Sequence, residues 1–198
     1  MLPPILRSVE RAGHVIFVDG AFNLNLVGIR SLNRQANKFD DLLTATYRDA
    51  SAAWQTHYWP CTLEPGAFWL EHPAKVEGTA ILADGQHRSA FCIGIHKPNT
   101  PNAYRCLVQH RPVRVWRDAT KDLTLDWPAN DQGKPGWYSI QIHRAHYSKV
   151  VSDVGPWSGG CPVVQVPEHF AELMSLVDIA RPQWGDAFTL TIMSEDKF

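Results

Sequence analysis

Residues 157–161, Trp-Ser-Gly-Gly-Cys, combine a thiol with two consecutive glycines. A cysteine that acts as a nucleophile needs a base within hydrogen-bond reach and N–H donors for the oxyanion that forms on attack. Gly159 and Gly160 permit backbone conformations closed to other residues, so that successive N–H groups could converge on one oxygen. The same glycines also suit a buried cysteine at a tight turn, and this stretch alone leaves both interpretations open.

His143 is the candidate base for Cys161. It ends the apolar stretch 136–143 and precedes the cysteine by 18 residues. A strand ending at His143, followed by a loop that returns, would place the thiol beside the imidazole. An exposed histidine at a strand end is the simpler alternative. A zinc site formed by His143, His146 and Cys161 is another, although histidines three apart on an irregular loop have little specificity for metal.

The elements that must position these residues are mostly strands. Alternating or β-branched runs separated by turn signals predict one hairpin over 14–30 around Asp19-Gly20 and a second over 42–63. Further strands are predicted at 78–82, 89–96, 104–109, 113–118, 136–143 and 188–193. Residues 126–136 are polar and rich in Pro and Gly, which predicts a loop. The last strand alternates as a half-buried strand does.

One helix is predicted after Pro167. Its apolar residues Phe170, Leu173, Met174 and Val177 share one face, and it should end before Pro182. Residues 5–12 form a second, short candidate helix. The sequence therefore predicts a mainly β domain with one or two helices, of the α+β class, covering residues 1–198 with an N-terminal extension over about 1–37.

Composition excludes several classes of function. The 198 residues carry 19 Lys+Arg and 20 Asp+Glu, so there is no basic field typical of nucleic-acid binding. No apolar run is long enough for a membrane span. The four cysteines are too scattered for a disulfide framework, and no C-x-x-C indicates structural zinc. Cys61, Cys92 and Cys106 lie in apolar or β-like runs typical of core thiols. No cofactor, metal, nucleic-acid partner or membrane partner is expected.

Residues 142–161, IHRAHYSKVVSDVGPWSGGC, resemble the active-site signature of the L,D-transpeptidase catalytic domain. That signature is a histidine, about 14 to 17 residues, and then Ser/Thr-His-Gly-Cys. Here 14 residues separate His143 from Ser158, which opens Ser-Gly-Gly-Cys. Residues 42–66 resemble the early hairpin of the family, so a weaker similarity covers roughly 40–193. The pattern is also similar to phage or effector-type proteins with Trp-Ser-small-Gly-Cys.

The resemblance implies a β-sandwich or barrel and a peptidoglycan stem peptide as substrate. Cys161, deprotonated by His143, would attack the carbonyl of an L-centre and release a D-amino acid. The N–H groups of Gly160 and Cys161, with Gly159 as a third donor, would hold the oxyanion. The Arg144 carbonyl or the Ser158 hydroxyl would fix the tautomer of His143. Residues that could bind substrate are Trp157, His87, Arg88, His96 and His146.

Two positions depart from the family pattern. Gly159 stands where a second histidine is usual, and Pro162 where an aliphatic residue is. Alternatives to a transpeptidase (a transferase) are therefore an L,D-carboxypeptidase or endopeptidase (a hydrolase) acting as a phage lysin or antibacterial effector, and a decayed protein that binds cell wall without cutting it. A cysteine protease of host proteins is another. The start lacks a signal-peptide pattern, so work on the wall would need phage lysis, a virion or a secretion apparatus.

Overall fold

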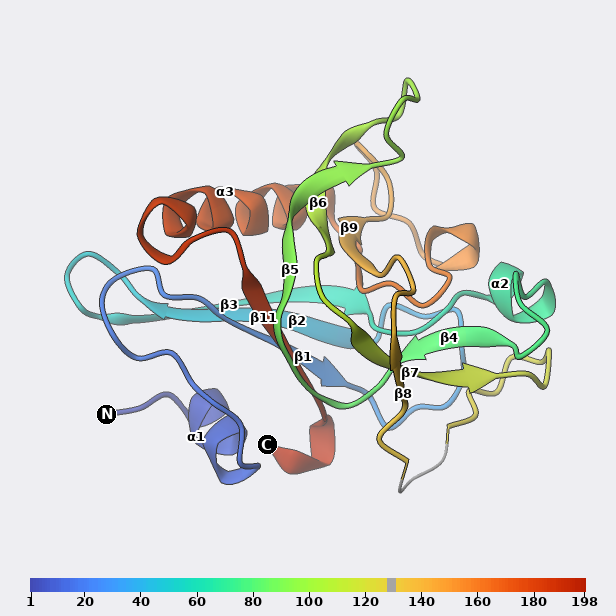
Figure 1. The fold of residues 1–198 in the computed structure, drawn as a ribbon, viewed down its shortest axis with the longest axis horizontal. Coiled ribbons are helices and arrows are strands. Elements are labelled where there is room, and N and C mark those ends of the chain that lie inside the picture. Colours follow the sequence, from blue (N-terminus) through green and yellow to red (C-terminus); the bar gives the residue numbers. More distant parts are fainter. Residues whose placement is uncertain (128–130) are drawn as a thin grey trace.

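A computed structural model describes residues 1–127 and 131–198 of the chain. Within these residues eight strands close into a barrel in the order β1-β11-β5-β6-β9-β10-β3-β2, and three form a separate sheet in the order β4-β7-β8 (Figure 1). The barrel strands are β1 (Asn25–Arg30), β2 (Asp41–Arg48), β3 (Trp54–Thr62), β5 (Gly85–His96), β6 (Tyr104–Gln109), β9 (Gln141–Arg144), β10 (Val163–Val164) and β11 (Phe188–Ser194). The sheet strands are β4 (Thr79–Leu82), β7 (Val113–Asp118) and β8 (Lys134–Gly136).

Three α-helices, α1 (Pro4–Arg11), α2 (Ala67–Glu71) and α3 (Pro167–Trp184), and two 3-10 turns, η1 (Gly155–Trp157) and η2 (Glu195–Lys197), complete the described part. The mainly β prediction is confirmed in this coarse form, although α2 was missed. Of residues 1–37, expected to be an extension, Asn25–Arg30 form a barrel strand. No helix within the described residues combines the length and the apolar character needed to cross a membrane.

Helix α3 covers one mouth of the barrel (Figure 1). The four residues of its predicted face, Phe170, Leu173, Met174 and Val177, are all buried in the barrel core. The prediction that the helix ends before Pro182 is wrong, since it continues to Trp184 and stops at Gly185, where φ is +82°. A proline this close to the C-terminus removes a single N–H donor, which the last turn tolerates.

The predicted hairpin over 14–30 is wrong in its first half. Residues 14–18 form no strand, because side-chain amides satisfy their backbone. The Asn25 amide accepts from Phe17 N (2.7 Å) and donates to its carbonyl (2.8 Å), and Gln86 does the same for Val15 at 3.1 and 2.7 Å. The second hairpin is confirmed as β2–β3, with Thr44 opposite Tyr58.

The single strand predicted over 136–143 is interrupted. Lys134–Gly136 instead form β8 within the predicted loop 126–136, part of which (128–130) lies outside the described residues. Ser139 has a φ of +57°, and the Gln109 side chain accepts the N–H groups of Tyr138 and Ile140 at 2.9 and 3.2 Å. The chain therefore leaves the small sheet and joins the barrel only at β9. Strand β11, expected to be half-buried, is covered on both faces.

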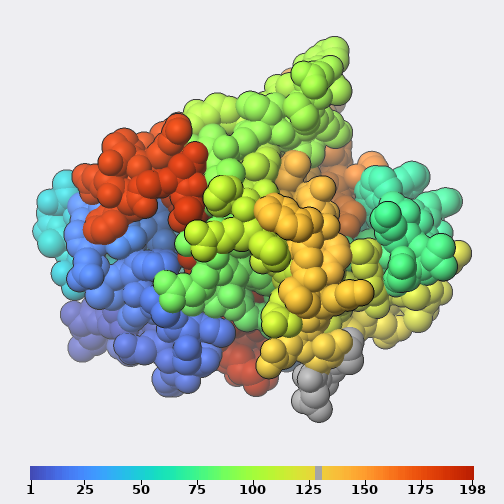
Figure 2. All heavy atoms as spheres, in the orientation of Figure 1, coloured from blue at the N-terminus to red at the C-terminus, as the bar shows by residue number. Residues whose placement is uncertain are grey.

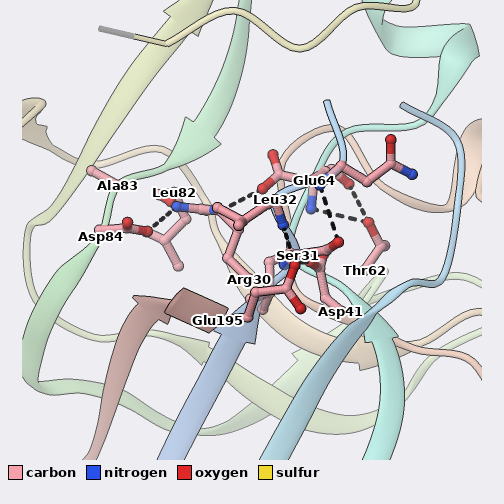
Figure 3. Close-up of polar contacts among 12 residues, drawn as sticks. Arg30, Ser31, Leu32, Asp41, Thr62, Glu64, Leu82, Ala83, Asp84 and Glu195 are labelled. Carbon is pink, nitrogen blue, oxygen red and sulfur yellow. Dashed lines mark hydrogen bonds and ion pairs between the residues drawn. The ribbon is translucent and has the colours of Figure 1, made fainter. Parts of the chain in front are cut away.

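Arg30 connects the barrel to the small sheet (Figure 3). This side chain is fully buried at the end of β1, and its guanidinium donates to Glu64 at 2.5 Å and to the Leu82 carbonyl at 2.6 Å, and also pairs with Asp84. Buried charges are stable only when they are paired and hydrogen-bonded in this way. The network fixes β4, and with it the wall beside the Ser-Gly-Gly-Cys loop, against the barrel.

Candidate active site

Strands β9 and β10 bring the backbone of His143 beside the segment that follows Cys161. They pair in parallel, with Val163 opposite His143, and the His143 N–H donates to the Pro162 carbonyl at 3.1 Å. Two residues earlier on both segments, the Gln141 N–H points at the Cys161 sulfur, with a nitrogen–sulfur distance of 3.4 Å. Residues two apart on a strand lie on the same face. Cys161 and His143 therefore belong to two adjacent segments, and Cys161 lies beside Gln141, the residue two positions before His143 on the same face.

The imidazole of His143 is held in one tautomer. Its Nδ1 lies 2.9 Å from the Arg144 carbonyl, which can only accept, so Nδ1 carries the proton and Nε2 is the basic nitrogen. The Tyr104 hydroxyl donates to the same carbonyl at 3.2 Å. Nε2 makes no hydrogen bond within residues 1–127 and 131–198. Of the two orienting groups expected for this ring, the carbonyl is in place, whereas the Ser158 hydroxyl bonds elsewhere.

The two groups of the candidate dyad, His143 and Cys161, both favour their neutral forms. Burial, with a contribution from His96, lowers the pKa of His143 to about 3, despite the hydrogen bond to the Arg144 carbonyl. Burial raises the pKa of the Cys161 thiol to about 11, opposed by the Gln141 N–H. Both shifts disfavour the thiolate–imidazolium pair, because desolvation penalises the charged form of each group. The site fits a thiol that transfers its proton during attack, rather than a preformed thiolate.

Ser158 shapes the loop that holds the nucleophile. This buried residue donates from its hydroxyl to the Cys161 carbonyl at 2.8 Å, and its Oγ accepts from the Gly160 N–H at 3.1 Å. The expectation that the Gly160 N–H binds the oxyanion is therefore wrong for this conformation, since that donor is already used. In the part of the chain that the structure describes, the N–H groups of Gly159 and Cys161 have no acceptor and stay available.

The two glycines have different steric roles. Gly160 has a φ of +110°, and a Cβ added there would lie 2.1 Å from the Ala80 carbonyl oxygen, so that no other residue fits. A Cβ at Gly159 would meet only the Trp69 indole, at 3.4 Å. Trp69, on α2, is anchored by a 3.0 Å hydrogen bond from its Nε1 to the Pro156 carbonyl. The indole of Trp69 thus packs beside Gly159, the position at which the family that the sequence resembles usually has a histidine.

His96, the last residue of β5, adds a second imidazole to the site. Its ring stacks on that of His143, with centroids 4.5 Å apart and planes inclined by 22°. Its Nδ1 lies 2.6 Å from the Gln141 Oε1. Gln141 therefore contacts both His96, through its side chain, and the Cys161 sulfur, through its N–H. Burial lowers the pKa of His96.

Two pockets lie at opposite ends of the segment 139–147, and neither is lined by His143 or Cys161. One, of about 560 Å³, is lined by His96, Tyr104, Arg144, His146 and Trp157, among others, so three of the residues predicted to bind substrate meet there. The other, of about 570 Å³, is bounded by Ser139 and Gly159.

His87 and Arg88 do not belong to this site, and their prediction as substrate ligands is wrong. They lie at the start of β5, nine and eight residues before His96, which ends the strand. His87 is buried with its Nε2 on the Ala83 carbonyl (2.9 Å), while Arg88 is exposed and lines a separate pocket with Arg114. Both ends of the strand looked alike in sequence, but it is the His96 end whose side chain contacts His143 and Gln141 of β9.

The alternative of a zinc site finds no geometry in the described residues, where no three His, Cys, Asp or Glu side chains are grouped to hold a metal ion. His146 stacks on Tyr147 with centroids 4.6 Å apart, and its Nδ1 accepts from the N–H groups of Ser148 and Lys149 at 3.1 and 3.2 Å.

Sequence reasoning missed three residues that complete the site. Gln141 carried a usable signal, since it lies two residues before His143 on a strand. Tyr104 and Trp69 carried none, because each reaches the site through tertiary contacts with residues far along the chain. Comparisons of the chain with protein-family models, with curated proteins and with solved structures find no match.

Proposed function

We propose that the protein is a cysteine acyltransferase or peptidase of the L,D-transpeptidase type, acting on peptidoglycan stem peptides. One observation carries this proposal: the thiol of Cys161 contacts the N–H of Gln141, two residues before His143 on the same strand. The Nδ1 of His143 is bonded to a carbonyl, and its Nε2 has no hydrogen-bond partner among the described residues. An acyl-transfer nucleophile needs such a base. The identity of the substrate comes from the sequence resemblance.

The first chemical step is an attack coupled to proton transfer. The Cys161 sulfur bonds to the carbonyl carbon of an L-centre while its proton passes to His143 Nε2. The N–H groups of Cys161 and Gly159 are the donors available to the oxyanion. Collapse breaks the peptide bond, and the departing D-amino acid takes the proton from Nε2, which leaves a thioester on Cys161. The neutral resting dyad suits this order, because no charge has to be buried before substrate arrives.

The thioester has two fates. An amine that attacks it forms a cross-link or exchanges the D-amino acid, and water gives L,D-carboxypeptidase or endopeptidase activity. In either case His143 accepts the proton of the attacking group and returns it to the departing sulfur. The two pockets at either end of the segment 139–147 provide room for an acyl donor and an acceptor.

The proposal is tested by incubating purified muropeptides with the wild-type protein and with Cys161→Ala, and following the products by mass spectrometry. Loss of the terminal D-Ala mass reports hydrolysis, and joined stems report transpeptidation. Only the wild type should form either product. If no muropeptide changes with the wild-type protein, the enzymatic proposal fails and a protein that only binds cell wall becomes the better account.

A further inference from the structure

The pocket beside Gly159, here named the sheet pocket, is built largely by the small sheet. Its boundaries come from α2 and the segment after it, from β7 and from residues 134–139, and include Trp69, Lys75, Arg117, Lys134 and Trp137. Figure 2 shows a recess between the gold segment near residue 137 and the teal-green segment that contains α2. Gly159 places the catalytic loop at its edge.

The charge of the sheet pocket is predominantly positive. Lys75, Arg117 and Lys134 line it against one carboxylate, Glu77. None of these three cations forms an ion pair with a carboxylate in residues 1–127 and 131–198. Cations that face a pocket without a carboxylate partner are available to an anionic ligand.

Arg117 is the most firmly positioned of the three cations. It is half-buried on β7, its Nη1 donates to the Gly78 carbonyl at 2.9 Å, and its guanidinium lies 5.2 Å from the centre of the Tyr138 ring. A guanidinium fixed in this way keeps further N–H donors for a carboxylate, which it binds in bidentate geometry. Lys134 is exposed on the neighbouring strand β8, which pairs with β7.

Trp137 supplies an aromatic wall on the solvent side. Its side chain is 66% exposed, which is unusual for a tryptophan without a partner. Together with Trp69 at the catalytic loop, it gives the sheet pocket two aromatic faces between which an extended peptide could lie. Aromatic faces combined with a few placed cations are typical of sites for small amphipathic ligands.

We propose that the sheet pocket binds a free carboxylate of the acyl-donor stem peptide through Arg117 and Lys134. The identity of that peptide rests on the proposed function. Stem peptides carry carboxylates outside the scissile bond, so the charge of the pocket complements the substrate. Amidating the recognised carboxylate would remove the partner of two cations and weaken binding, whereas the attacked carbonyl would be unchanged.

The test is equilibrium binding to Cys161→Ala protein, in which no turnover occurs. A stem tetrapeptide with all carboxylates free is compared with peptides that are amidated at one carboxylate at a time, using tryptophan fluorescence from Trp69 and Trp137 or calorimetry. We expect amidation at one position to raise the Kd about tenfold. Arg117→Gln and Lys134→Gln should each raise the Kd of the peptide whose carboxylates are all free. That Kd should then approach the Kd of the amidated peptide.

Arg88→Gln is the matched control, because it removes the same charge from an exposed site in a separate pocket and should leave both Kd values unchanged. Lys134→Gln keeps the test valid if Arg117→Gln folds poorly, since Lys134 is exposed. Absence of any amidation effect, or an effect that survives Lys134→Gln and a folded Arg117→Gln, overturns the inference. Carboxylate-dependent binding without turnover by wild type would overturn the proposed function alone.

Discussion

The imidazole of His96 stacks on the imidazole of His143 with ring centroids 4.5 Å apart, although the two residues are 47 positions apart in the chain. His96 also holds Gln141, whose N–H contacts the Cys161 sulfur. One ring thus touches both the proposed base and the residue that contacts the proposed nucleophile, which makes His96 a positioning residue in the proposed mechanism.

His96→Ala should lower kcat/KM about tenfold or more, because the His143 ring loses the surface that orients it. His96→Phe keeps a flat ring and should recover most of the loss in kcat. Steady-state kinetics on a stem peptide separate this effect on kcat from any change in KM that follows from the position of His96 in the pocket wall. An alanine variant as active as the wild type would show that the stack has no role in catalysis.

The pH dependence of kcat/KM follows from the neutral dyad. The pKa of His143 is lowered to about 3 and that of Cys161 is raised to about 11, and the active protonation state lies between the two. Activity should therefore be flat from about pH 5 to pH 9, falling only beyond those limits. The ultraviolet thiolate absorbance at neutral pH should be the same in wild type and Cys161→Ala. A thiolate signal at pH 7 with an alkaline limb near pH 8 would indicate a preformed ion pair instead.

The two glycines of the loop form a matched pair for mutagenesis. Gly160→Ala places a Cβ 2.1 Å from the Ala80 carbonyl at a φ of +110° and should cost about 2 kcal/mol or more of unfolding free energy, with loss of activity. Gly159→Ala meets only the Trp69 ring at 3.4 Å and should fold normally. Urea unfolding of both variants gives the comparison. Equal tolerance at the two positions would contradict the described backbone of this loop.

Arg30 is predicted to be essential for stability. Arg30→Met removes the partner of the buried Glu64 and of Asp84 and should cost about 3–5 kcal/mol. Arg105→Met is the control: it breaks an exposed pair with Asp178 and should cost less than about 1 kcal/mol. Denaturant midpoints of the two variants measure the difference. Similar midpoints would mean that the Arg30 network does not hold the small sheet to the barrel.

The sequence predicted most strands and the α3 face because these patterns are local: alternation and spacing by three and four residues are visible within ten positions. It failed where a distant group decides the structure. Residues 14–18 form no strand because Gln86 and Asn25 satisfy their backbone, and the run 136–143 breaks at Ser139, whose positive φ no pattern announces.

The same distinction between local patterns and distant contacts applies to the candidate site. That the segments of His143 and Cys161 lie side by side could be predicted, since a strand, a return and a loop suffice for it. The contacts of Trp69 and Tyr104 could not, because each depends on how separate elements pack. His87 was misplaced because its strand is twelve residues long, from Gly85 to His96, and the contacts with β9 are made by the side chain of His96 at the far end.

The central claim, that Cys161 carries an acyl intermediate, is tested most directly by rapid acid quenching of a reaction with a stem tetrapeptide, followed by intact mass measurement and peptide mapping. The account predicts an adduct on Cys161 with the mass of the stem acyl group lacking its terminal D-amino acid, formed more slowly in His143→Gln and absent from Cys161→Ala. Product formation by Cys161→Ala at the wild-type rate, or an adduct on another residue, would contradict it.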